Sequence, residues 1–131
     1  MNDFSMLAFH ELQQSQMLRA LHDSNESSLR YGLALSDTEI EALVVHHQET
    51  LRECRRVEVG EGILKQLIEV FCDSPYLVPS TYAQTLTELQ ELFYYFKSEA
   101  GETLSDEELL TLMKERFDGE AQGSLDYLEG T

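Results

Sequence analysis

The chain has 131 residues, of which nine are Lys or Arg and 25 are Asp or Glu, so its formal net charge is −16. This excess of carboxylates disfavours direct binding to nucleic acids and to anionic membranes, because both depend on clustered basic side chains. The length and the hydrophobic fraction of 42% fit one folded domain whose core needs no disulfide or metal.

The two cysteines, Cys54 and Cys72, lie in helical patterns, and the N-terminus lacks the basic and apolar regions of a secretory signal. No stretch is apolar over the roughly 18 residues that a membrane span requires. We therefore expect a cytoplasmic protein with reduced thiols. Asp73 next to Cys72 disfavours the thiolate, so this cysteine is not expected to be a nucleophile.

The N-terminal segment, residues 1–32, is predicted to be helical. A first helix begins at about Met6, and Ser24 offers a cap for one or two further turns that close at Gly32. The apolar residues of the first helix do not stay on one face along its length. The pattern therefore leaves open whether this segment packs on the main body, residues 33–131.

A capping box from Ser36 to Glu39 predicts the start of the next helix, because each of these side chains can bond the other's backbone amide. We expect this helix to end near Arg56, followed by a short extended piece over residues 56–59. No second strand is available to pair with that piece. The core face of the helix is expected to contain Ile40, Leu43, Val44, His47, Leu51 and Cys54.

Two further helices form the predicted centre of the domain. Between Ile63 and Cys72 almost every residue is apolar, which indicates the most enclosed helix. The helix over residues 80–99 has Ser80 as its expected cap and Gly101 as its stop. Its apolar stripe is formed by Tyr82, Leu86, Leu89, Phe93 and Phe96, with Leu92, Tyr94 and Tyr95 widening it.

A second capping box, from Ser105 to Glu108, predicts a helix that ends at Gly119, and Gly123 opens a last short turn or helix. The periodic apolar faces together predict an all-α fold. We expect a single compact domain of five to seven helices over residues 1–131, with short connections and antiparallel neighbours.

Four sequence blocks carry a resemblance to a known family. They are GEGIL from Gly60, FCDSPY from Phe71, FYYFK from Phe93, and FDG from Phe117 through GSL at Gly123. With these blocks the chain resembles, from about residue 33 onwards, an uncharacterised bacterial family of short acidic proteins known only as a domain of unknown function. The resemblance implies a bacterial cytoplasmic protein, and it implies no activity, cofactor or catalytic residue.

One pattern near the C-terminus has the spacing of a calcium-binding loop. Counted from Asp118, the carboxylates Glu120, Asp126 and Glu129 fall at positions that supply oxygen ligands in an EF-hand. The alternative is a glycine-capped helix end followed by a solvated acidic tail. Both interpretations remain open at this point.

A second candidate metal site involves His46 and His47, with His10 or His22 as additional ligands. Neither the spacing of a zinc protease nor that of a carboxylate-bridged bundle is present. Because His47 lies on the apolar face, a hydrogen-bonded core histidine is the alternative. No cofactor is predicted.

The remaining candidates are surfaces for a partner. Tyr94 and Tyr95 add aromatic area beyond the core stripe, and Arg52, Arg55 and Arg56 form the single basic cluster, which could dock an acidic partner or a small anion. No nucleophile, base and orienting group can be assembled, so the sequence does not predict an enzyme.

Our leading hypothesis is therefore a non-catalytic protein–protein interaction module or small subunit with an unidentified protein partner, which includes the case of a homodimer. The first alternative is a metal- or small-ligand-binding helical protein that uses carboxylates and histidines. A third is an acidic surrogate for nucleic acid, which would need carboxylates spaced like phosphates.

Overall fold

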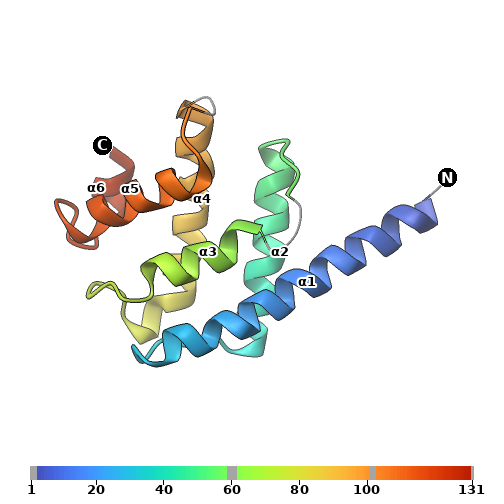
Figure 1. Cartoon of the computed structure of the whole chain (residues 1–131), viewed down its shortest axis with the longest axis horizontal. Helices are drawn as coiled ribbons and strands as arrows, with labels where there is room; N and C mark the ends of the chain where they lie inside the picture. Colours follow the sequence, from blue (N-terminus) through green and yellow to red (C-terminus); the bar gives the residue numbers. More distant parts are fainter. Residues whose placement is uncertain (1–2, 59–61, 101–102, 131) are drawn as a thin grey trace.

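The computed structural model describes residues 3–58, 62–100 and 103–130, with side chains described for Leu12 and from Gln14 onwards. In these ranges the chain forms six α-helices and one short 3₁₀ helix and contains no strand, so the predicted all-α fold is confirmed (Figure 1). The α-helices are α1 (Asp3–Leu29), α2 (Asp37–Glu53), α3 (Gly62–Phe71), α4 (Tyr82–Ala100), α5 (Asp106–Asp118) and α6 (Leu125–Gly130), and the 3₁₀ helix is η1 (Pro79–Thr81).

Helix α3 lies at the centre and packs against α1, α4 and α5. Its buried residues are Ile63, Leu64, Leu67, Ile68 and Phe71, as its nearly continuous apolar sequence predicts. The edge of the Phe117 ring in α5 meets Phe71, with 5.5 Å between the ring centroids. Helices α2 and α4 pack against each other, and α6 packs on both α4 and α5. None of the described helices is long and apolar enough to cross a bilayer.

Both predicted capping boxes are present. Ser36 and Ser105 each accept a hydrogen bond from the amide three residues later, and Glu39 and Glu108 each bond back to the capping amide. These caps satisfy amides that the first turn of a helix otherwise leaves without a partner.

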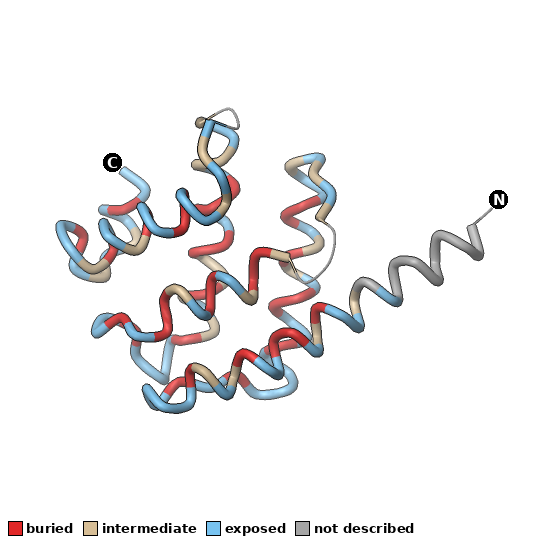
Figure 2. The backbone as a smooth tube through the Cα atoms, viewed as in Figure 1, coloured by how far each residue is buried: buried red, intermediate tan, exposed pale blue. Residues whose placement is uncertain are grey.

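Helix α1 differs from its prediction, because it is one continuous helix where we expected a break at Ser24. The Ser24 side chain is buried and donates to the carbonyl oxygen of Ala20 at 2.9 Å, so its hydroxyl has a partner inside the helix and does not cap a new turn. Met17, Ala20 and Leu21 are buried, so the second half of α1 packs on the body. The first half projects away from it (Figure 1), and buried positions recur along the second half (Figure 2).

Two helix ends also differ from expectation. Ser80 does not cap α4, because it lies inside η1, which leads directly into α4. Helix α2 ends at Glu53, short of Arg56, because Arg55 adopts a left-handed backbone with φ 56°. The amide of Arg56 then bonds the carbonyl of Leu51 at 2.9 Å, which is the hydrogen bond of a Schellman termination. The residues predicted as extended, 56–58, have no regular structure, and Val59 lies outside the described residues.

Candidate functional site

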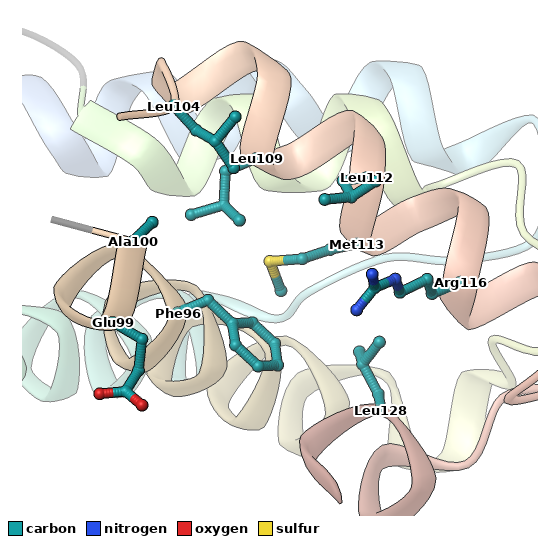
Figure 3. A pocket seen from close by; sticks show the side chains of 9 residues that line it. All are labelled: Phe96, Glu99, Ala100, Leu104, Leu109, Leu112, Met113, Arg116 and Leu128. Carbon is teal, nitrogen blue, oxygen red and sulfur yellow. The ribbon is translucent and has the colours of Figure 1, made fainter. Parts of the chain in front are cut away.

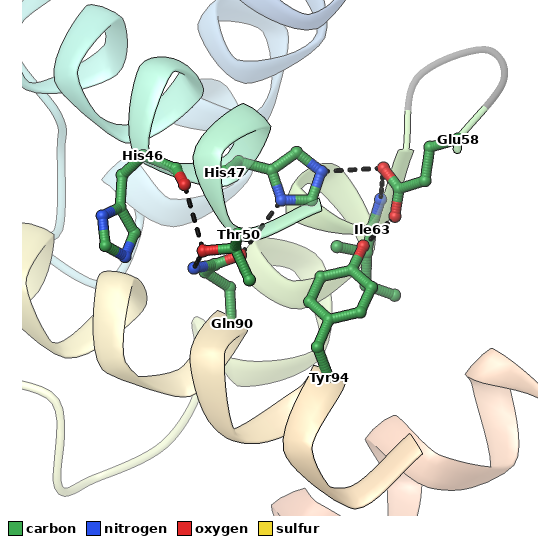
Figure 4. A network of polar contacts seen from close by, with 7 residues as sticks. All are labelled: His46, His47, Thr50, Glu58, Ile63, Gln90 and Tyr94. Atoms are coloured by element: carbon green, nitrogen blue, oxygen red, sulfur yellow. Dashed lines mark hydrogen bonds and ion pairs between the residues drawn. The ribbon is translucent and has the colours of Figure 1, made fainter. Parts of the chain in front are cut away.

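A buried polar network joins the middle of α2, the segment after α2 and the middle of α4 (Figure 4). At its centre is the fully buried side chain of His47. Its Nδ1 lies 3.1 Å from Oε1 of Gln90, and its Nε2 lies 2.8 Å from Oε1 of Glu58. A hydrogen-bonded core histidine was one of the two interpretations of His47, and the structure has that arrangement.

The Gln90 side chain contacts both Thr50 and His47 of α2. Nε2 of Gln90 donates to Oγ1 of Thr50 at 2.9 Å, and that hydroxyl donates to the carbonyl oxygen of His46 at 3.0 Å. The Gln90 amide therefore presents its oxygen to the imidazole. The carboxylate of Glu58 faces the other ring nitrogen, so the imidazole of His47 lies between the Gln90 amide and the Glu58 carboxylate.

Glu58 is held from several sides. Besides His47, its carboxylate accepts hydrogen bonds from the hydroxyl of Tyr94 and, at 3.3 Å, from the backbone amide of Ile63 at the start of α3. Burial raises the pKa of Glu58, but the hydrogen bond and charge of His47, together with the bonds from Tyr94 and Ile63, outweigh it and hold the pKa below its ordinary value. Gly62 has φ +77°, and a Cβ there would collide with this carboxylate.

These properties are those of a structural ion pair. A carboxylate with a lowered pKa is a poor general base, and burial, followed by the Glu58 charge, raises the pKa of the Tyr94 hydroxyl, so the tyrosine stays neutral. The network ties α2, α3 and α4 together through Glu58, because each of these helices contributes a group that bonds its carboxylate.

The three arginines of the predicted cluster do not all line the same cleft. Arg52 and Arg56 line a cleft of about 420 Å³ between α1 and the end of α2, whereas Arg55 does not. Glu58 also lines the cleft, so a small anion there would meet a carboxylate as well as two guanidinium groups. The other lining residues are Gln14, Met17, Gln48, Leu51 and Val57.

The candidate calcium ligands near the C-terminus have other contacts in the structure. Asp118 accepts a hydrogen bond from Ser74 at 2.6 Å and pairs with Lys114 at 3.0 Å, and Glu120 accepts from the hydroxyl of Tyr127. Asp126 and Glu129 lie on helix α6.

The candidate metal-binding histidines lie in separate surroundings. His46 is half-buried and pairs with Glu91 at 2.8 Å, while His22 lies 3.8 Å from Asp37, and the side chain of His10 lies outside the described residues. Among the described residues, no group of three His, Cys, Asp or Glu side chains is arranged to hold a metal ion.

The two adjacent tyrosines have opposite environments. Tyr94 is 3% exposed and belongs to the buried network, so its predicted role as an interaction residue is not available to it. Tyr95 is 51% exposed and lines a hollow of about 250 Å³ between α4 and α6. The other lining residues of this hollow are Glu88, Glu91, Leu92, Leu125, Asp126 and Glu129. We call it the Tyr95 hollow.

A second depression, which the sequence analysis did not predict, lies between the end of α4, α5 and α6 (Figure 3). It has a volume of about 270 Å³ and is lined by Phe96, Glu99, Ala100, Leu104, Leu109, Leu112, Met113, Arg116 and Leu128. Its position depends on how three helices meet, so the separate apolar stripes of those helices gave no signal for it. We call it the apolar pocket.

Comparison with known protein families places most of the chain in one of them. A family of unknown function, DUF6323, matches residues 20–131. The chain belongs to this family. No curated protein and no solved structure matches the chain.

The DUF6323 match extends further towards the N-terminus than the four sequence blocks indicated, since it begins at Ala20 and not near residue 33. Ala20 and Leu21 are buried against the body. The part of the chain that DUF6323 covers therefore includes the packed end of α1, together with the His47 network, the Tyr95 hollow and the apolar pocket.

Proposed function

We propose that the protein is a non-catalytic interaction module that binds a basic segment of a partner protein in the Tyr95 hollow. The observation that carries the proposal is the half-exposed ring of Tyr95, which lies in a hollow that four carboxylates also line. Aromatic residues that remain exposed are enriched where proteins meet a partner.

The positions of the carboxylates favour a cationic occupant. Glu88, Glu91 and Tyr95 follow one another at three and four residues along α4, so they share one face of that helix. Asp126 and Glu129 face them from α6. In the described ranges, Glu91 alone among these four acidic residues has an ion-pair partner, the histidine side chain of His46.

A Lys or Arg side chain would interact with both the carboxylates and the aromatic ring of the Tyr95 hollow. Its charge would offset the repulsion between the carboxylates and form charge-assisted hydrogen bonds with them, while the face of the Tyr95 ring attracts a cation. A second copy of this acidic chain is a poorer fit, because a homodimer through the hollow would bring eight carboxylates together. The proposal assigns the protein to the cytoplasm of a bacterial cell, and its two free cysteines fit a reducing compartment.

Site-specific photocrosslinking in cells that produce the protein tests this proposal. A photoreactive phenylalanine analogue replaces Tyr95 in one variant and Tyr31, which is 47% exposed and lies in the turn after α1, in the control. We expect Tyr95 to yield a crosslink to one protein through a Lys- or Arg-rich peptide, and Tyr31 to yield none. Equal crosslinks from both positions, or none from position 95, would contradict the proposal.

Charge neutralisation provides the second arm of the test. The double variant Asp126→Asn with Glu129→Gln should abolish the crosslink, because it removes half of the acidic groups of the hollow. Glu41→Gln with Glu115→Gln makes the same change in net charge at exposed positions outside the hollow and should leave the crosslink intact. Equal loss in both variants would mean that net charge alone drives the association.

A further inference from the structure

The apolar pocket contains one feature that its hydrophobic lining does not explain. Met113, Leu109 and Leu128 form its floor and are almost fully buried, while Leu112 is partly exposed at its edge. The guanidinium group of Arg116 points into the opening between Met113 and Leu128 (Figure 3). An apolar depression thus has a cation at its mouth.

Arg116 lacks a carboxylate partner within the described residues, although acidic residues outnumber basic ones by 25 to nine in this chain. Glu99 also lines the pocket, but its carboxylate points away from the opening (Figure 3). The charge that faces the pocket is therefore the positive charge of Arg116.

We propose that the apolar pocket binds a small amphipathic carboxylate, with its alkyl chain against Met113, Leu109 and Leu128 and its carboxylate on Arg116. This site is separate from the Tyr95 hollow. The size of the pocket limits the chain: a cavity of about 150 Å³ accepts benzene, so about 270 Å³ suits an alkyl chain of roughly six to eight carbons. Burial of that chain supplies the binding free energy, and the guanidinium group selects the acid.

Two other occupants fit the same surface less well. The acyl chain of a lipid in an anionic bilayer would bring the membrane against a protein of net charge −16, which repels it. An apolar side chain from a partner helix would fill the pocket but would bring no carboxylate to Arg116. A free carboxylate with a short alkyl chain satisfies both the walls and the charge.

Octanoate and 1-octanol are the matched probes, because they share a chain length and differ in charge. Methyl NMR with labelled methionine follows binding: the methyl group of Met113 lies in the pocket, and that of Met17, a buried residue of α1 outside the pocket, serves as the internal reference. We expect octanoate to shift the Met113 signal saturably, with one molecule bound per chain and at least fivefold tighter than 1-octanol. The Met17 signal should not move.

Variants test the apolar walls of the pocket and the charge of Arg116 independently. Ala100→Leu fills the pocket from the end of α4 and should weaken both probes at least tenfold. Arg116→Gln should weaken octanoate to the level of 1-octanol and leave 1-octanol unchanged. Arg19→Gln, at an exposed position on α1 outside the pocket, is the control and should bind both probes as the unaltered protein does.

The result can overturn the inference in several ways. An unshifted Met113 signal, equal affinity for octanoate and 1-octanol, or unchanged binding by Ala100→Leu would each do so. If Ala100→Leu unfolds at a lower temperature than the unaltered protein, Leu112→Glu is the second variant. It places a carboxylate at the partly exposed edge of the pocket and should weaken octanoate at least fivefold more than 1-octanol.

Discussion

Replacing Glu58 by Gln tests whether the buried ion pair with His47 holds three helices together. Loss of one partner from a buried pair costs about 3–5 kcal/mol, because the other charge stays buried without compensation. Here the side chain of Glu58 remains 16% exposed, and the new amide oxygen can still accept from His47. We therefore expect a loss of about 2–3 kcal/mol in the free energy of unfolding. In a chain of 131 residues this lowers the melting temperature by roughly 10 °C.

Urea unfolding measures this change, with Glu69→Gln as the control at an exposed position on α3. The control should alter the free energy of unfolding by less than about 0.5 kcal/mol. A double-mutant cycle with His47→Gln should give a coupling energy above about 1 kcal/mol, because the two side chains touch. A loss below about 1 kcal/mol, or a coupling energy near zero, would refute the assignment of a structural ion pair.

The dependence on pH follows from the lowered pKa of Glu58 in the folded state. A carboxylate whose folded pKa lies below its ordinary value of 4.5 contributes stability that is fully present above pH 4.5. That stability is lost as the pH falls through the lower folded pKa. The difference in unfolding free energy between the unaltered protein and Glu58→Gln should therefore be constant just above pH 4.5 and shrink below it. A difference that grows as the pH falls would contradict this reasoning.

Two further predictions concern a turn and the thiols. Gly123→Ala should lower the free energy of unfolding, measured in urea, by about 1–3 kcal/mol, because φ is +84° and the added Cβ would lie 2.6 Å from Cβ of Tyr76. Gly130→Ala is the control and should be neutral, because nothing lies within 4 Å of its added Cβ. Equal losses of stability in the two variants would contradict this prediction. Iodoacetamide should modify the half-buried Cys54 before Cys72, because burial, followed by the charge of Asp73, raises the pKa of the Cys72 thiol. Peptide mass spectrometry measures the order of labelling. Faster labelling of Cys72 would contradict the prediction.

The sequence predicted the parts of the fold that depend on neighbouring residues. The capping boxes at Ser36 and Ser105 are complete within four positions, so both helix starts could be located. Ser24 and Ser80 are also serines, but the side chain of each could either cap a helix or form a hydrogen bond with the nearby backbone. Packing of α1 on α3 and the turn at η1 decide between these outcomes, and neither is visible in a local pattern.

The candidate sites depend on contacts between distant residues, which periodicity does not specify. The apolar face of α2 identified His47 as a core residue, but not Glu58 and Gln90 as its partners, which lie 11 and 43 positions away. Tyr94 and Tyr95 lie about 100° apart around α4. The width of the apolar stripe could not show which of them would be covered by a neighbouring helix.

The projecting half of α1, residues 3–16, is about 20 Å of helix. Because the packed half of α1 has already nucleated the helix, each further turn is easier to form than in an isolated peptide. A reporter domain joined rigidly to this end would therefore sit at a fixed distance from the body and rotate with it. Fluorescence anisotropy of such a fusion would follow the tumbling of the whole protein.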